Sequence, residues 1–415
     1  MSEHTNPNIW EPKFASRTDK MQASEIRELL KLLDRPDLIS FAGGIPDPAL
    51  FPIEKIRSAY QSTLANVEDA NRALQYSVSE GDPKLRNWIV GHMATRGIEC
   101  EAENILITNG SQQGLEFLGK LFLSPNDTAL VTAPTYLGAL QAFASNEPAY
   151  DELKLENTNR TANSYSQSAK AAGGEVKFAY VVPDFANPSG ETMNEQARQN
   201  LLELSRELDV PVIEDCPYSQ LRYDGKEIAS IQALDIETCG SIDNSRVIYC
   251  GTFSKVFTPG LRVGWICATR DIIKRLTLIK QASDLNSSAI NQSVMLYLAE
   301  RLFDHQVKTA RDSYRKKRDA MLEALQSYMP EGVSWSKPEG GLFIWVTLPK
   351  EIDTSALLKK AVDEEKIAFV PGHAFFVNDD GHNTMRLSFS LPDVTQIKAG
   401  IKRLAKLVQS ELAYI

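Results

Sequence analysis

The middle of the chain alternates short, continuously apolar runs with segments of helical periodicity. The apolar runs lie at residues 105–108, 129–132, 178–182, 210–214 and 247–251. Strands that are apolar on both faces and separated by helices are typical of a mostly parallel sheet covered by helices on both sides. Ligands of such sheets bind beyond the carboxyl ends of the strands. We therefore expect an α/β domain with its functional site at those strand ends.

The pattern changes after about residue 305. The segments expected there are a long charged helix at 306–325, strands at 341–348 and 385–390, and helices at 355–364 and from residue 394. A chain of 415 residues also exceeds the roughly 250–300 residues that one hydrophobic core usually serves. The sequence predicts a large domain plus a smaller α+β domain built from the N- and C-terminal segments. We expect divisions at 1–60, 61–305 and 306–415.

Residues 156–175 are rich in Asn, Thr, Ser, Ala and Gly, and we expect them to form a surface loop.

Composition narrows the possible functions. The net charge is −9 with no long basic run, which argues against nucleic acid or an anionic membrane as the main partner. No apolar run approaches the roughly 18 residues of a membrane-spanning helix. The five cysteines form no CxxC pair and indicate reduced thiols in a cytoplasmic protein. The five histidines form no HExxH or HxH cluster, so we expect no metal site.

The strongest local signal surrounds Lys255, just after the last apolar run. A partly desolvated amine close to the Arg262 cation would have a lowered pKa and be a better nucleophile toward an aldehyde. The hydroxyls of Thr252 and Ser254, with the Arg262 guanidinium, could hold a phosphate dianion. The alternative is a surface lysine beside a Pro-Gly turn.

Two further motifs follow apolar runs. Ser111 and Gln112 open a helix after residues 105–108, where free N–H groups favour an anion; an ordinary N-cap serine is the alternative. Asp215 directly follows the run at 210–214, where a buried carboxylate is costly without a partner. A protonated pyridine nitrogen would be such a partner, and capping of a neighbouring helix is the alternative.

Two more motifs complete the set. Asn187 could donate to a phenolate oxygen, or could simply form a turn with Pro188. Tyr136 could stack on a flat heteroaromatic ring, or could pack in the core. All five motifs lie at strand ends of one expected sheet. Together they offer an amine, a phosphate cradle, a stacking ring, an acid and a hydrogen-bond donor.

Several stretches carry a family resemblance: residues 74–76, 80–86, 110–113, 187–190 and 370–372, together with those around Asp215 and Lys255. With them the chain resembles the class I/II aminotransferases of the fold-type I pyridoxal-phosphate group, from about Ser24 to the end. Residues 39–48 are most similar to the branch containing α-aminoadipate and kynurenine aminotransferases.

The resemblance implies pyridoxal 5′-phosphate as cofactor and a role for each matching residue. Lys255 would hold the cofactor covalently and move a proton, and Asp215 would pair with the ring nitrogen. Asn187 and Tyr218 would bond the phenolate oxygen, and Tyr136 would stack on the ring. The phosphate would be held by Ser111, Gln112, Thr252, Ser254 and Arg262.

For the substrate and the assembly, the resemblance implies further roles. Arg386 would bind the substrate α-carboxylate, Asn187 would also contact the substrate, and Gly44 lies where an N-terminal loop covers it. Tyr76 would reach the phosphate of a neighbouring subunit, which implies a homodimer with shared active sites. The catalytic set would be Lys255, Asp215 and Tyr218.

The implied reaction moves the amino group of an α-amino acid to a 2-oxo acid, by analogy 2-oxoglutarate, in a ping-pong mechanism through pyridoxamine phosphate. The alternatives are another pyridoxal-phosphate reaction, such as a β-lyase or decarboxylase, or a non-catalytic sensor. Because only about twenty residues precede Met21, we expect no DNA-binding module there. The donor stays open among aminoadipate, aromatic, branched-chain and other amino acids. Arg27, on a helix expected to open at Ser24, could reach a distal carboxylate or could be solvated.

Overall fold

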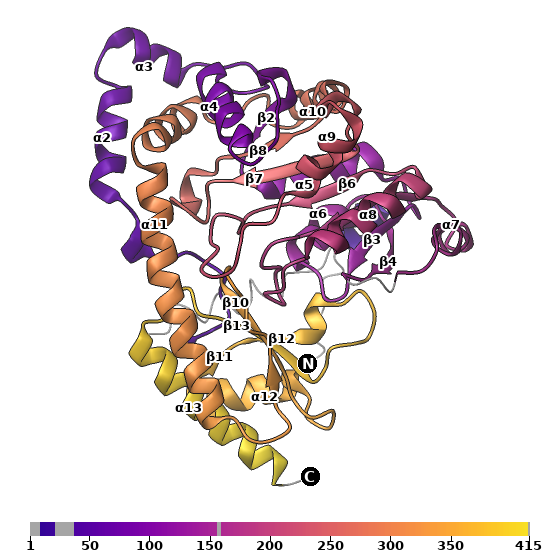
Figure 1. Ribbon diagram of the computed structural model, residues 1–415, viewed down its shortest axis with the longest axis vertical. Helices are drawn as coiled ribbons and strands as arrows, with labels where there is room; N and C mark the ends of the chain where they lie inside the picture. The colour runs from indigo at the N-terminus through magenta and orange to yellow at the C-terminus, as the bar shows by residue number, and fades with distance from the viewer. Residues whose placement is uncertain (1–8, 21–36, 156–158, 414–415) are drawn as a thin grey trace.

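A computed structural model describes residues 9–20, 37–155 and 159–413. Two sheets lie at opposite ends of the main body, and the long helix α11 (Ala289–Tyr328) runs beside both (Figure 1). The larger sheet has the strand order β2-β8-β7-β6-β5-β3-β4, and the smaller has the order β12-β13-β10-β9.

The larger sheet confirms the expected mostly parallel arrangement. From β7 to β4 every neighbouring pair is parallel, whereas β8 runs antiparallel to both β2 and β7. The strands are β2 (Ile105–Thr108), β3 (Thr128–Thr132), β4 (Ala149–Leu153), β5 (Val176–Val181), β6 (Val212–Asp215), β7 (Val247–Thr252) and β8 (Gly264–Cys267). The five expected strands are present. Two further strands were not expected from the sequence: β4 is a mostly half-exposed edge strand, and β8 has four residues that follow the Lys255 loop.

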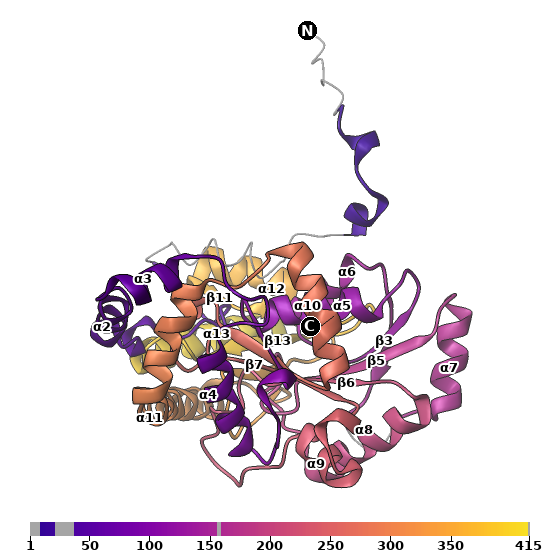
Figure 2. The ribbon, with the colours of Figure 1, turned by 90° about the horizontal axis from the view of Figure 1, so that it is seen from above.

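Helices cover both faces of this sheet (Figure 2). One face carries α5 (Ser111–Phe122), α6 (Leu137–Ala144) and α10 (Arg270–Ser283), and the other carries α8 (Glu195–Leu208) and α9 (Ile231–Cys239). Helix α8 begins at Glu195 because the Asn194 side chain caps it by accepting from the Ala197 N–H, and its apolar face is buried.

The expected loop at residues 156–175 is wrong over much of its length. Residues Ala162–Ala171 form the helix α7, whose first turn is capped by the Thr161 side chain accepting from the Ser164 N–H. Tyr165 and Ala169 lie one turn apart on the buried side of α7. Alanine is the most favourable residue in a helix, and the burial of Tyr165 and Ala169 stabilises α7. The small polar residues around them gave no apolar periodicity from which the helix could be predicted.

The smaller sheet is antiparallel, and its residues come from the C-terminal part of the chain. Its strands are β9 (Ser334–Trp335), β10 (Phe343–Thr347), β12 (Val370–Pro371) and β13 (Thr384–Ser388), and its helices are α12 (Thr354–Lys360) and α13 (Val394–Leu412). A separate short pair joins β1 (Ile39–Ser40) to β11 (Ile367–Ala368) in parallel. Part of the N-terminal segment therefore lies with the C-terminal strands.

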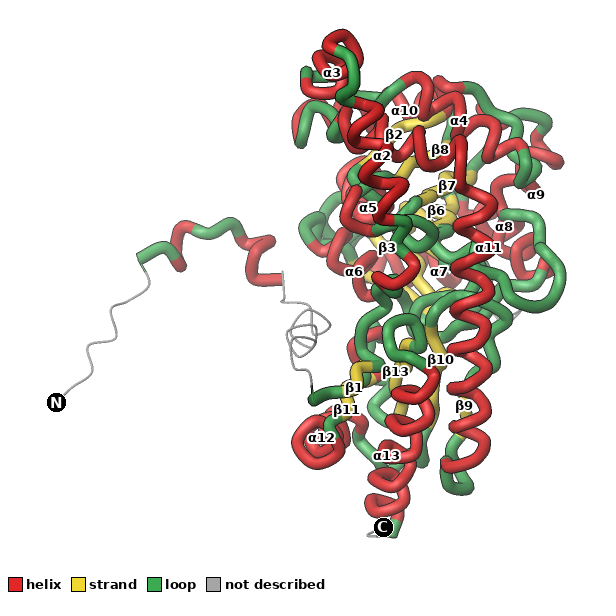
Figure 3. Tube along the Cα trace, turned by 90° about the vertical axis from the view of Figure 1, so that its left-hand side faces the viewer, coloured by secondary structure: helices red, strands yellow, loops and turns green. Residues whose placement is uncertain are grey.

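Helix α11 begins at Ala289 rather than at residue 306. The expected division between residues 305 and 306 lies inside this helix, and the three domain ranges stay a prediction. Helix α13 packs on α11, and so do three helices from the N-terminal part of the chain: α2 (Ile53–Thr63), α3 (Val67–Leu74) and α4 (Pro83–Ala94). Figure 3 shows α11 passing from the larger sheet to the smaller one.

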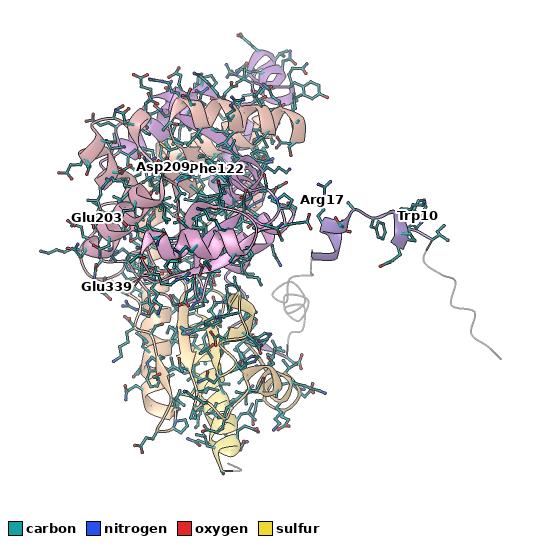
Figure 4. The ribbon with its side chains drawn as sticks, turned by 90° about the vertical axis from the view of Figure 1, so that its right-hand side faces the viewer. Trp10, Arg17, Phe122, Glu203, Asp209 and Glu339 are labelled. Carbon is teal, nitrogen blue, oxygen red and sulfur yellow. The ribbon has the colours of Figure 1, made fainter. Side chains whose placement is uncertain are left out.

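One hydrophobic cluster extends through both sheets, because Phe178 and Ile213 of the larger sheet share it with Phe343 and Leu387 of the smaller. Residues 9–20 extend away from this body, as the labelled side chains of Trp10 and Arg17 show (Figure 4). Within the described residues, no helix has the length and apolar character needed to cross a membrane.

Candidate active site

A cavity of about 340 Å³ opens beyond the carboxyl ends of the larger sheet's strands. It brings together nearly all the residues that the sequence predicted for the site. Its lining includes Gly44, Ser111, Gln112, Tyr136, Asn187, Asp215, Tyr218, Thr252, Ser254, Lys255, Arg262 and Arg386. The exception is Tyr76, which lies outside the lining and is 80% exposed. Residues that the sequence analysis did not single out also line it, among them Ile45, Leu137, Gln141 and Phe343.

Lys255 follows β7 and points its amine into the cavity, where Nζ donates to the Gly44 carbonyl at 3.0 Å. Burial, together with the nearby Arg386 and Arg262 cations, lowers the pKa of this amine to about 8, and Asp215 acts in the other direction. Near neutral pH a sizeable fraction of the amine is therefore uncharged and nucleophilic.

Asp215 is the last residue of β6, and its carboxylate is buried. The Tyr180 hydroxyl donates to Oδ2 at 2.9 Å, whereas Oδ1 has no hydrogen-bond partner. Burial raises the pKa of this carboxyl to about 7, although Tyr180 and Lys255 act in the other direction. A buried acceptor without a donor is costly. A protonated ring nitrogen would supply the missing donor and the missing charge, so this residue fits the pyridine ring of the expected cofactor.

Arg386 lies on β13, only 1% exposed. Its Nη1 donates to Asn187 Oδ1 at 2.7 Å, its Nη2 donates to the Ala42 carbonyl at 2.5 Å, and Nε has no partner. Burial lowers the pKa of the guanidinium to about 10, which leaves it a cation at neutral pH. The cation lies 4.4 Å from the centre of the Phe343 ring. A buried cation with unused donors suits a carboxylate ligand.

Tyr218 and Asn187 form a pair beside the lysine. Their side chains share a hydrogen bond, and burial raises the pKa of the Tyr218 hydroxyl. The Lys255 amine lies 5.9 Å from the centre of the Tyr218 ring. Because Asn187 accepts from Arg386 through Oδ1, its amide nitrogen is the end left to donate.

A candidate phosphate cradle lies at the start of α5. Ser111 is the first residue of that helix rather than its cap, which is Gly110 with a φ of +78°. A side chain at Gly110 would be strained and would place a Cβ 2.4 Å from Arg262 Nη2, so glycine is required here. Thr252 Oγ1 donates to Ser254 Oγ at 2.9 Å. Hydroxyls, a guanidinium and the free N–H groups of a helix start suit a dianion.

Tyr136 and Gln112 line the cavity next to this cradle. The Tyr136 hydroxyl donates to Gln112 Oε1 at 3.3 Å, and Gln112 Nε2 donates to the Gly138 carbonyl at 2.6 Å. These bonds hold the tyrosine ring at the start of α6, where it forms one wall of the cavity.

Sequence reasoning missed Tyr180 and Phe343. Tyr180 had a usable signal, since it is a hydroxyl-bearing side chain in the otherwise apolar stretch 178–181. Phe343 had none, because its position over Arg386 depends on the antiparallel pairing of β10 with β13.

The family model for aminotransferases of class I and II matches residues 36–404. The chain belongs to this family. Its reaction is therefore transamination, and its cofactor is pyridoxal 5′-phosphate. A similar curated relative is aromatic-amino-acid aminotransferase 1 of Thermococcus litoralis, with 42% identity over 97% of this chain and 95% of the relative.

Solved aminotransferases share the fold. A kynurenine aminotransferase of Pyrococcus horikoshii, solved with PMP, KYN and KYA, has 43% identity and a TM-score of 0.89 over 98% of this chain and 99% of its own. An α-aminoadipate aminotransferase of Thermus thermophilus, complexed with N-(5′-phosphopyridoxyl)-L-leucine, has 35% identity and a TM-score of 0.87 over 98% of this chain and 100% of its own. These likenesses agree with the expected branch and with the fold-type I assignment.

Proposed function

We propose that this aminotransferase moves the amino group of aromatic and other uncharged α-amino acids to 2-oxoglutarate, with Lys255 as its catalytic lysine. One observation carries the proposal. A neutralisable amine, a buried carboxylate with an unpaired oxygen and a buried guanidinium with unused donors line the same cavity. A cofactor ring and an amino-acid carboxylate would satisfy all three.

The cofactor's orientation follows from the groups that would hold it. Asp215 would pair with the ring nitrogen, Asn187 and Tyr218 would bond the phenolate oxygen, and Tyr136 would stack on the ring. The phosphate would lie in the cradle of Ser111, Gln112, Thr252, Ser254 and Arg262. Once bound, the cofactor supplies the electron sink that stabilises negative charge at the substrate Cα, and it carries the amino group between the two substrates.

Arg386 would bind the α-carboxylate of either substrate. A guanidinium has five N–H donors, and the two bonds already made leave Nε and further N–H groups for the ligand. The bonds to Asn187 and Ala42 fix the plane of the guanidinium before the substrate arrives. Fixed donors lose little entropy on binding, which favours a well-oriented carboxylate.

Lys255 would act on the proton at the substrate Cα. Its Nζ would take that proton as a base and return a proton as an acid, two roles that suit an amine whose pKa is near the working pH. Tyr218 lies beside this amine and contributes to its orientation. The Gly44 carbonyl, which accepts from Nζ, belongs to the segment that would cover the substrate.

The choice of donor is supported by the rest of the lining. Apart from residues assigned to the cofactor and the carboxylate, the described wall includes the uncharged Ile45, Leu137, Gln141 and Phe343. The aromatic and kynurenine aminotransferases among the similar proteins act on flat, uncharged side chains, which suits such a wall.

The test is a comparison of kcat/KM for phenylalanine, tyrosine, kynurenine and 2-aminoadipate, each with 2-oxoglutarate and with pyruvate as acceptor. The proposal requires the aromatic donors and 2-oxoglutarate to give the highest values. A clear preference for 2-aminoadipate would overturn the donor assignment, and a preference for pyruvate would overturn the acceptor. Arg27, the residue that could bind a distal carboxylate, lies outside the described residues and stays a prediction. Its role would appear as a loss of 2-aminoadipate turnover alone in Arg27→Ala.

We also propose that the chain works as a homodimer with shared active sites, in the cytoplasm. The 80% exposed Tyr76 is accompanied by other exposed apolar side chains on and beside α3: Val67, Leu74 and Val78. An exposed apolar group of this kind favours contact with another protein surface. The five cysteines are all free, which suits a reducing compartment.

A further inference from the structure

A partly buried polar network lies directly behind the proposed phosphate cradle. It joins the end of α10 to the turn that precedes α5. Its members, here called the α10 anchor, are Asn109, Gln113, Lys280, Asp284 and Ser287. None of these five residues belongs to the lining of the cavity.

Asp284 holds both ends of the cradle turn. Its Oδ2 accepts from Asn109 Nδ2 at 2.6 Å and from Gln113 Nε2 at 2.8 Å. Gln113 Oε1 in turn accepts from the Asn109 backbone N–H at 2.9 Å. The segment between Asn109 and Gln113 contains Ser111 and Gln112. One carboxylate oxygen therefore fixes the residues on either side of two proposed phosphate ligands.

Lys280 holds Asp284 in turn. The Lys280 side chain is completely buried, and its Nζ donates to both Asp284 oxygens at 3.0 Å and to Ser287 Oγ at 2.9 Å. A fourth bond reaches Gln113 Oε1 at 3.2 Å. A buried ammonium is costly unless it is paired and hydrogen-bonded, so Lys280 restricts Asp284 to one position.

The network also reaches Arg262. The Asn109 carbonyl accepts from Arg262 Nη2 at 2.9 Å, and Gly110 packs against the same guanidinium. The position of Asn109 therefore determines both where the α5 N–H groups point and where the Arg262 guanidinium lies. Partners behind a ligand shell commonly set ligand affinity in this way.

We propose that Asp284 is a positioning residue for the cofactor phosphate. It touches neither substrate nor cofactor, and it acts by holding Asn109 and Gln113 so that Ser111, Gln112 and Arg262 face one phosphate. The inference rests on the proposed phosphate cradle. A merely structural role, in which Asp284 only ties α10 to α5, would make a different prediction, since it would not depend on the phosphate.

The experiment measures the dissociation constants of pyridoxamine phosphate and of pyridoxamine for the apoenzyme. Neither ligand bonds covalently to Lys255. The dissociation constant of pyridoxamine divided by that of pyridoxamine phosphate isolates the contribution of the phosphate, and this ratio falls when the phosphate is held less tightly. We expect Asp284→Asn to raise the dissociation constant of pyridoxamine phosphate by about tenfold, by analogy with the loss of other outer-shell partners. The dissociation constant of pyridoxamine should stay unchanged. The matched control is Asp271→Asn, which removes an exposed ion pair on the same helix.

A second variant keeps the test valid if Asp284→Asn fails to fold. Asp284→Asn leaves Lys280 without its full charge partner, whereas Asn109→Ala keeps the Lys280–Asp284 pair and removes only one arm of the network. We expect Asn109→Ala to reduce the phosphate-dependent ratio several-fold. A ratio that stays at the wild-type value in both variants would overturn the proposal, including the case in which both dissociation constants rise by the same factor.

Arg262→Gln separates this inference from the cradle assignment. A reduced ratio in Arg262→Gln with a normal ratio in Asp284→Asn would overturn the role of Asp284 and leave the cradle in place. A normal ratio in Arg262→Gln would remove the cradle assignment and the inference together.

Discussion

Arg386 donates from Nη1 to Asn187 Oδ1 at 2.7 Å, although the two residues lie 199 positions apart in the sequence. The bond joins β13 of the smaller sheet to the loop after β5 of the larger one. Both side chains are buried, so the bond is shielded from competition by water. Arg386, which we propose binds the substrate carboxylate, and Asn187, which we propose binds the cofactor's phenolate oxygen, thus orient each other.

Arg386→Lys should raise KM for amino-acid donors by about 100-fold, because a lysine ammonium cannot make a planar, two-point contact with a carboxylate. Steady-state kinetics with phenylalanine checks this, and the near-visible absorption of the bound cofactor should stay unchanged as a control. A KM within a factor of about two of the wild type would assign the carboxylate to another residue.

Asp215→Asn should stabilise the apoprotein, and more so at high pH. The pKa of Asp215 is about 7 in the folded chain and about 3.9 in an unfolded one, so the folded state retains its proton to higher pH. The wild type therefore loses stability as the pH rises from about 4 to about 7, whereas the amide does not titrate. The advantage of the variant should grow by about 2 kcal/mol between pH 5.5 and pH 8.

Denaturant unfolding of both apoproteins at the two pH values checks this prediction. The same variant should lose most of its transaminase activity when loaded with cofactor, because the ring nitrogen would lack its anionic partner. An equal advantage at both pH values would mean that Asp215 is not titrating in this range.

Lys255 should capture pyridoxal phosphate with a pH dependence set by its lowered pKa. The neutral amine is the nucleophile, so the rate constant for reconstitution of the apoenzyme should rise with pH and level off above about 8. Stopped-flow absorbance between pH 6 and pH 10 measures it, with free N-acetyl-lysine as the reference amine. A rise centred near 10.5, the ordinary lysine value, would show that the cavity does not perturb this amine.

Tyr76 should act across the subunit interface. Mixed dimers of a Tyr76→Ala chain and a Lys255→Ala chain place both lesions in one active site and leave the other site intact. Such hybrids should recover activity toward half of the wild-type value, although each parent is impaired. Light scattering establishes the dimer first. Hybrids without recovered activity would place Tyr76 outside the shared site.

The strands and the positions of most site motifs could be predicted because these motifs lie at, or a few residues beyond, the end of an apolar strand. Asp215 and Lys255 needed only local sequence, since a buried strand end already dictates where their side chains lie. The surroundings of these residues could not be predicted. Tyr180 reaches Asp215 from a neighbouring strand, and Phe343 reaches Arg386 through a register between β10 and β13.

The missed elements have the same cause. Strand β8 pairs antiparallel between β2 and β7, which makes the Lys255 segment a connection between two neighbouring strands. The four residues of β8 are too few for their periodicity or composition to indicate which strands they pair with. Helix α7 could not be predicted because most of its residues are small or polar and only Tyr165 and Ala169 form its buried side. In both cases the decisive information lies in tertiary contacts.

The most direct test follows the near-visible absorption of the enzyme loaded with pyridoxal phosphate while phenylalanine and then 2-oxoglutarate are added, in the wild type and in Lys255→Ala. The wild-type band should bleach with the amino acid and return with the oxo acid, and the variant should fold but lose at least about four orders of magnitude in turnover. Turnover near the wild-type rate in Lys255→Ala, or a wild-type band that no amino acid bleaches, would contradict the central role given to Lys255.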